Sequence, residues 1–162
     1  MRIVMQVEFD VKMDAGTIYD YMINRTYSRA PGVLEAAAGA VLLLLFGRTG
    51  NILCLAASLI VFAAPPVLLY LKAGRRTGDP DYSPVLHYTL TEEGVEAVGE
   101  KTRDFWKWNE LEKAVSTNKS VILYTSGSRA CIFPRAELKD SLIPAVEMIS
   151  TRMPPRKVNI RM

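Results

Sequence analysis

Two long apolar runs in the middle of the chain, within residues 32–71, constrain its fold more than any other feature. No charged residue lies between Glu35 and Arg48, or between Arg48 and Lys72. Helices made from these runs would be apolar all round, and the rest of the chain is not apolar enough to bury them. We therefore predict a transmembrane helical hairpin rather than a buried hairpin in a soluble protein.

The two runs differ in length. A helix needs about 20 mainly apolar residues to cross ~30 Å of hydrocarbon, and residues 52–71 meet this requirement. Residues 33–46 are too few, so the first helix spans only if it extends back towards Arg29 or if the bilayer thins around it. The short turn between the runs makes the two helices antiparallel neighbours.

Small residues and prolines in the two runs predict how the helices of the hairpin pack and bend. Gly32, Ala36 and Ala40 recur every four residues, so they share one helix face that another backbone could approach closely. That face could pack on the second helix or on a second copy of the protein. Pro65 and Pro66 remove two backbone donors and predict a kink in the second helix.

Basic residues near the spans predict the orientation, because they are retained on the cytoplasmic side. Arg48 is alone in the turn, whereas five basic residues flank the hairpin, namely Arg25, Arg29, Lys72, Arg75 and Arg76. We expect a multi-pass protein of the bacterial cytoplasmic membrane with both termini in the cytoplasm. The start of the chain lacks a basic region followed by an apolar one, so no cleaved signal peptide is expected.

Residues 1–31 are expected to form a strand and an amphipathic helix. Apolar and polar residues alternate from Arg2 to Lys12, the period of a half-buried strand. Asp14 can cap a helix that runs to about Arg29. This helix could lie in the membrane interface or pack on a soluble core.

Residues 72–84 read as a linker, and residues 85–162 as a β domain with a C-terminal helix. The helix should run from Asp140 or Ser141 to about Met153. If the N-terminal strand joins the sheet, seven strands and a closing helix indicate a pleckstrin-homology-like (PH-like) antiparallel barrel or sandwich, within a membrane α+β protein. Six strands are expected in meander order, at residues 85–90, 95–99, 102–108, 113–117, 120–125 and 129–133.

The search for chemistry predicts no catalytic residue, no cofactor and no metal site. His87 is the only histidine and alternates with apolar neighbours on a strand. Cys54 and Cys131 do not have the spacing of metal ligands, and we expect both to pack as small apolar side chains. The formal net charge of +3 is too small to indicate nucleic acid as a partner. We expect a non-enzymatic protein.

The aromatic strand near residue 106 is the one candidate contact surface. Trp106 and Trp108 share one face of this strand, with Phe105 and Lys107 on the other. Trp108 could anchor the domain core. Alternatively, one of the aromatic residues, with Lys107 or Arg103, could face the bilayer surface or a partner.

Several short motifs resemble the YcxB-like family of small bacterial membrane proteins. They are Thr91-Glu92-Glu93-Gly94-Val95, Trp108-Asn109-Glu110-Leu111 followed by Glu112-Lys113-Ala114-Val115, and Ile132-Phe133-Pro134-Arg135. The resemblance implies residence in the inner membrane and a C-terminal domain with no catalytic residue to carry over.

Two roles fit these expectations. In the first, the cytoplasmic domain binds a protein partner or a lipid headgroup while the hairpin anchors it in the lipid bilayer. In the second, the protein is an accessory subunit of a transporter or enzyme complex that assembles through the hairpin. Self-association as a homodimer is compatible with either role.

Overall fold

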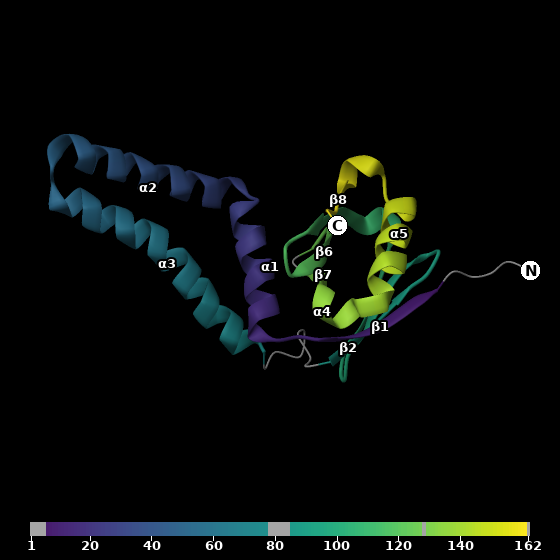
Figure 1. The fold of residues 1–162 in the computed structure, drawn as a ribbon. Helices are drawn as coiled ribbons and strands as arrows, with labels where there is room; N and C mark the ends of the chain where they lie inside the picture. Colours follow the sequence, from purple (N-terminus) through teal and green to yellow (C-terminus); the bar gives the residue numbers. More distant parts are fainter. Residues whose placement is uncertain (1–5, 78–84, 128, 162) are drawn as a thin grey trace, which may run out of the picture.

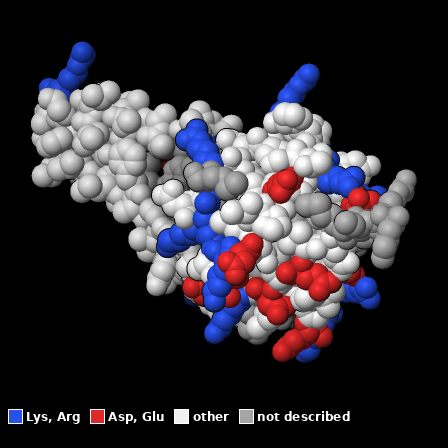
Figure 2. Space-filling model, turned by 45° about the vertical axis from the view of Figure 1, so that its right-hand side comes forward, with Lys and Arg blue, Asp and Glu red and all other residues white. Residues whose placement is uncertain are grey.

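The computed structural model describes residues 6–77, 85–127 and 129–161. A long two-helix arm projects from a body that contains the sheets (Figure 1). Figure 2 shows charged side chains gathered on the body, while the arm carries few of them in that view.

The arm consists of α2 (Ala30–Thr49) and α3 (Ile52–Arg76), and both helices are long and apolar enough to cross a membrane. Gly50 ends α2 with φ of 66°, a left-handed conformation that glycine adopts without steric cost. Asn51 then caps α3 by accepting a hydrogen bond from the Leu53 amide, at 3.0 Å. Since α2 begins at Ala30, it has the extra turn that the short first run requires.

The second helix of the arm continues through both of its prolines and ends at Arg76. Figure 1 shows α3 changing direction along its length, so Pro65 and Pro66 lie within a bent helix and not at a break. The helix also takes in residues 72–76, which were expected to begin the linker. The rest of that linker, from residue 78 to 84, lies outside the described residues.

Helix α1 (Ala15–Tyr27) lies between the arm and the sheets. Asp14 caps it as predicted, because its carboxylate accepts a hydrogen bond from the Thr17 amide at 2.7 Å. Ile18 and Tyr21 are buried on the side facing the body. This helix therefore packs as an amphipathic helix on a core, the second of the two alternatives.

The first sheet is fully antiparallel, in the order β1 (Val7–Lys12), β2 (Val85–Leu90), β3 (Gly94–Val98) and β4 (Arg103–Lys107). Strands β1 and β2 pair along their whole length although the hairpin lies between them in the sequence. The arm is thus an insertion between two neighbouring strands of one sheet, and both of its ends return to the body.

The second sheet has the order β7 (Ala130–Pro134), β6 (Ser120–Thr125), β5 (Leu111–Ser116) and β8 (Val158–Asn159). An antiparallel barrel or sandwich was expected. Among the described residues the strands form two separate sheets rather than a closed barrel, and β8 pairs with β5 in parallel, which the expectation of antiparallel strands did not include. Strand β8 has only two residues, too few for alternation to reveal it.

Short helical segments connect and cover the sheets. Helix α5 (Leu142–Arg152) begins and ends within two residues of the prediction and buries Val146 and Ile149. The remaining segments are η2 (Trp108–Glu110), α4 (Arg135–Leu138), η3 (Lys139–Ser141) and η4 (Pro155–Lys157).

The core lies where the two sheets meet. Phe9 and Tyr88 from the first sheet both make edge-to-face contacts with Phe133 from the second, with ring centroids 5.1 and 4.8 Å apart. Phe133 is completely buried. Aromatic pairs of this geometry contribute about 0.5–1.5 kcal/mol beyond burial, so these three rings join the sheets.

Candidate functional site

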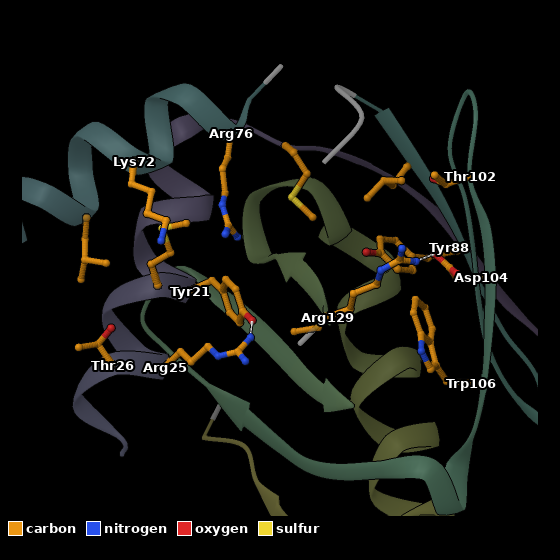
Figure 3. A pocket seen from close by; sticks show the side chains of 16 residues that line it. Tyr21, Arg25, Thr26, Lys72, Arg76, Tyr88, Thr102, Asp104, Trp106 and Arg129 are labelled. Carbon is orange, nitrogen blue, oxygen red and sulfur yellow. Dashed lines mark hydrogen bonds and ion pairs between the residues drawn. The ribbon is translucent and has the colours of Figure 1, made fainter. Parts of the chain in front are cut away.

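A pocket of about 350 Å³ lies at the base of the arm, between the helices and the first sheet. Figure 3 shows helix residues on one side of it and strand residues on the other. We call it the junction pocket. Its lining comprises Met13, Tyr21, Met22, Arg25, Thr26, Leu69, Lys72, Arg76, Leu86, Tyr88, Ala97, Thr102, Asp104, Trp106, Arg129 and Ala130.

The helix side of the pocket follows from residue spacing. Leu69, Lys72 and Arg76 are three and four residues apart, so they share one face at the end of α3. On α1, Tyr21 and Arg25 are likewise four apart, and the Arg25 guanidinium donates a hydrogen bond to the Tyr21 hydroxyl. Two helices thereby direct three cationic side chains towards the same cavity (Figure 3).

The strand side follows from the pleat of the first sheet. Tyr88 lies opposite Ala97, and Ala97 lies opposite Asp104, so these residues form a row across three strands. Trp106 is two residues further along β4 and points to the same side. Arg129 reaches this row from just before β7, and its Nη1 is 2.6 Å from Oδ2 of Asp104.

The described lining of the pocket is strongly basic. Four cations line it, Arg25, Lys72, Arg76 and Arg129, against the single carboxylate of Asp104. That carboxylate is already paired with Arg129. A cavity with walls of one sign concentrates counter-ions of the opposite sign, so this pocket favours an anionic ligand.

The pocket is also partly apolar. Met22, Leu69, Leu86 and Trp106 contribute to its lining beside the charged groups. Small-molecule sites typically combine an apolar lining with a few convergent polar groups. The arrangement suits a ligand with an anionic head and an apolar stem.

The aromatic residues predicted to form one contact surface lie in different environments, some in the core and some on the exterior. Trp108 is only 7% exposed, and its indole Nε1 donates a hydrogen bond to the Thr91 carbonyl at 3.0 Å. Trp106 faces the junction pocket and is half-buried. Phe105, at 46% exposure, lies on the outer face of β4.

The two basic residues predicted for that surface also lie on its outer face. Arg103 and Lys107 are exposed, and Arg103 pairs with Glu96 on β3. Neither residue lines the junction pocket. Their contact with a membrane surface or a partner remains a prediction.

The small residues predicted for helix packing are placed differently from one another. A side chain at Gly32 would meet the Thr26 carbonyl, in the bend between α1 and α2. Ala36 is half-buried and Ala40 is exposed. The close approach between α2 and α3 occurs instead at Gly39, where an added Cβ would lie 2.9 Å from the Phe62 ring.

The cations of the junction pocket were not predicted as a site. Arg25, Lys72 and Arg76 entered the sequence argument only as markers of orientation. Their clustering at the two ends of the hairpin was a usable signal. Arg129, by contrast, is more than fifty residues from Arg76 in the sequence, and only the fold brings it to them.

Other reactive side chains lie apart from this pocket. His87 pairs with Asp10 across β1 and β2, with Nδ1 and Oδ1 2.7 Å apart, in an exposed position. Burial raises the pKa of the Cys131 thiol, which disfavours the reactive thiolate. Among residues 6–77, 85–127 and 129–161, no three His, Cys, Asp or Glu side chains gather closely enough to hold a metal ion.

Comparison with known proteins finds a match for part of the sheet-bearing body. Residues 90–149 match the model of the family described as YcxB-like protein. This span runs from the end of β2 into α5. Searches of curated proteins and of solved structures found no significant match. The resemblance seen in the sequence motifs is therefore confirmed, and residues 90–149 are a YcxB-like segment.

Proposed function

We propose that the protein is a non-enzymatic binding protein of the bacterial cytoplasmic membrane, in which the junction pocket holds an anionic lipid headgroup. The hairpin spans the bilayer, and both termini lie in the cytoplasm. One observation carries the proposal: a pocket with four cations opens where the apolar part of α3 ends, at Lys72.

The position of the pocket favours a ligand from the membrane. Leu69 belongs to the apolar run of α3, and Lys72 is the first charged residue after it. If the arm spans, Lys72 and Arg76 therefore lie at headgroup level, where long basic side chains extend towards lipid phosphates. A headgroup could then enter the pocket from the side without leaving the bilayer surface.

The architecture of the body also supports a binding protein held at the membrane surface. Two packed four-stranded sheets and a C-terminal helix are compatible with the PH-like interpretation, although β8 adds a parallel strand to it. Both ends of the arm return to the body, through β1 with α1 and through β2. This double connection would hold the body against the cytoplasmic surface of the membrane.

Lipid binding by the full-length protein tests the proposal. The protein would be placed in phosphatidylcholine nanodiscs, with or without added anionic phospholipid. Native mass spectrometry would then release it from the nanodiscs and count the lipids that stay bound to it. We expect retained anionic lipid, and Arg76→Gln should lose it. Arg75→Gln is the matched control, because Arg75 is exposed and does not line the pocket. Equal retention of both lipid classes would refute the proposal.

A second candidate function is assembly through the hairpin. Gly39 packs against α3, whereas Ala40 is exposed and remains available to another membrane helix. The partner would be a second copy of the chain or a subunit of a transporter or enzyme complex. Crosslinking in native membranes from a cysteine at Ala40 would capture such a partner, and the absence of any protein adduct would exclude contact at this face.

A further inference from the structure

We infer that a second pocket, at the turn between β5 and β6, binds a small soluble phosphate, either inorganic phosphate or the phosphate ester of a polar molecule. Its volume is about 560 Å³, and we call it the turn pocket. None of its described lining residues also lines the junction pocket, so this inference does not depend on the proposed headgroup site. The lining consists of Ser116, Thr117, Asn118, Arg135, Asn159 and Arg161.

Backbone contacts bring the two arginines of the turn pocket together. Arg135 is the first residue of α4, and its amide donates a hydrogen bond to the Lys119 carbonyl at 2.8 Å. The Arg161 amide donates to the hydroxyl of Ser116, at the end of β5, over 2.7 Å. Nη2 of Arg135 in turn donates to the Arg161 carbonyl. The turn, the start of α4 and the segment after β8 therefore meet at one cavity.

The turn pocket carries positive charge. Arg135 and Arg161 line it, and no described lining residue is acidic. Neither arginine forms an ion pair with a residue that the structure describes. Asp20 on α1 does not line the pocket, but it accepts a hydrogen bond from the Thr117 hydroxyl at 2.5 Å. Two cations that share a cavity repel each other, so an anion bound between them is favourable.

One guanidinium N–H in this pocket lacks an acceptor. Nε of Arg135 is buried and has no hydrogen-bond partner among the described residues. Nearly all buried N–H groups in folded proteins have a partner, so such an exception indicates that a water molecule or an ion binds there. The positive charge of the cavity favours the ion. Because guanidinium groups donate paired, charge-assisted hydrogen bonds to carboxylate and phosphate oxygens, we expect an oxyanion.

The arrangement of the donors favours phosphate over carboxylate. Besides the two arginines, Asn118 in the turn and Asn159 on β8 contribute side-chain amides to the lining. A carboxylate presents its oxygens in one plane, and a single guanidinium can bind both of them. A phosphate presents oxygens in several directions. Donors that come from three separate segments of the chain can therefore bind it at the same time.

The lining also indicates the rest of the ligand. All described lining residues are polar, so this part of the pocket offers no apolar wall for an acyl chain. A volume of about 560 Å³ lies within the usual range for small-molecule sites. Figure 1 shows β6, β7 and β8 on the side of α1 away from the arm. The ligand is therefore a polar molecule that reaches the body from solvent and not from the bilayer.

Isothermal titration calorimetry tests this inference. Full-length protein in phosphatidylcholine nanodiscs would be titrated with inorganic phosphate at constant ionic strength, with acetate as the carboxylate control. We expect saturable binding of phosphate, and acetate at the same concentration should displace little of it. No binding of phosphate, or equal affinity for acetate, would overturn the inference. Glycerol 3-phosphate distinguishes the two soluble sources: binding tighter than that of inorganic phosphate identifies an ester, and weaker binding identifies inorganic phosphate.

Variants test whether the phosphate binds in the turn pocket. Arg135→Gln should weaken phosphate binding about tenfold, the effect of losing one charge-assisted hydrogen bond. Arg161→Gln should act similarly. This second variant should not disturb the fold, because the described hydrogen bonds of Arg161 involve only its backbone and its side chain is exposed. Circular dichroism would verify that each variant is folded.

Two further variants complete the test. Arg156→Gln changes an exposed arginine of the same C-terminal segment that does not line the pocket, and it should leave phosphate binding unchanged. A loss equal to that in Arg161→Gln would show that net charge attracts the phosphate and would overturn the inference. Arg76→Gln, in the junction pocket, should also have no effect. If it abolishes phosphate binding while Arg135→Gln and Arg161→Gln retain it, the phosphate occupies the junction pocket. That result would overturn the inference and support the proposed headgroup site.

Discussion

The hydroxyl of Ser58 donates a hydrogen bond to the carbonyl oxygen of Gly39, 3.0 Å away, across the two helices of the arm. Ser58 is buried although most of α3 is not, and Phe62, one turn later, covers the same glycine. Small residues allow this close approach, and a hydrogen bond between helices is favourable where no water competes for the groups. The hairpin is therefore joined at a defined level, about halfway along α2.

Replacing Gly39 with valine should separate α2 from α3. The added Cβ would lie 2.9 Å from the Phe62 ring, closer than carbon atoms pack, so the ring or the helix must move. Overpacking of this kind costs about 1–3 kcal/mol. The loss is measurable as a lower midpoint of unfolding in mixed detergent micelles.

Gly47→Val is the matched control for that change. Gly47 lies on the same helix, and an added Cβ there meets no other atom within 4 Å. It should leave the unfolding midpoint nearly unchanged. If both valines lower the midpoint equally, helix propensity rather than packing at Gly39 explains the effect. Phe62→Ala in the Gly39→Val background should restore part of the lost stability.

Replacing Trp108 with phenylalanine should destabilise the body. The ring would still fill most of the buried space, but the Thr91 carbonyl would lose the indole N–H that bonds to it at 3.0 Å. A partly buried acceptor left without its donor costs about 1–3 kcal/mol. Chemical denaturation followed by far-ultraviolet circular dichroism measures the difference.

Phe105→Leu provides the comparison on the same stretch of chain. Phe105 is 46% exposed on the outer face of β4. Its replacement by leucine should therefore lower the free energy of unfolding by about 0.5 kcal/mol at most, as is usual for surface positions. A Trp108→Phe variant as stable as Phe105→Leu would show that the indole bond contributes nothing.

The two tryptophans also show what the sequence could and could not predict. Alternation identified β1 to β7 and placed Trp106 opposite Phe105, since a strand exposes its two faces in turn. It did not show that the chain leaves β4 at Lys107, so that Trp108 belongs to the short helix η2. A change of backbone conformation at one residue has no periodic signal.

Contacts between segments far apart in the sequence were also predictable only in part. That the N-terminal strand joins a sheet could be expected, because a half-buried strand needs a neighbour, but its pairing with β2 is seen only in the structure. The parallel partner β8 could not be expected, since two residues carry no pattern. The junction pocket required both helix ends and Arg129 to be placed in space. Residue spacing could supply only the helical half of that arrangement.

Replacing Tyr124 with phenylalanine should loosen α1 from the second sheet. The Tyr124 hydroxyl donates a hydrogen bond to Oδ1 of Asn24 on α1, at 2.8 Å. Loss of one such bond costs about 0.5–1.5 kcal/mol at neutral pH. Thermal unfolding of the variant should show this loss, whereas Tyr27→Phe, at an exposed position on the same helix, should not.

The same tyrosine predicts how stability changes at high pH. The pKa of Tyr124 is raised from 10.0 to about 12, mainly by burial and to a lesser extent by the neighbouring Tyr21. The unfolded chain therefore loses this proton first, so the contribution of Tyr124 is complete below pH 10 and is lost as the pH rises through 12. The stability difference between wild type and Tyr124→Phe should narrow over this interval. A constant difference would contradict the assignment.

The proposed orientation can be tested at the turn of the hairpin. In a background with Cys54→Ala and Cys131→Ala, Thr49→Cys places a single exposed thiol at the last residue of α2. If the arm spans with both termini in the cytoplasm, an impermeant maleimide should label this thiol in intact cells. Ser150→Cys, at an exposed position on α5, should be labelled only after the membrane is opened. The reverse pattern would invert the topology, and because α3 ends at the junction pocket, it would also place that pocket on the outer surface of the membrane.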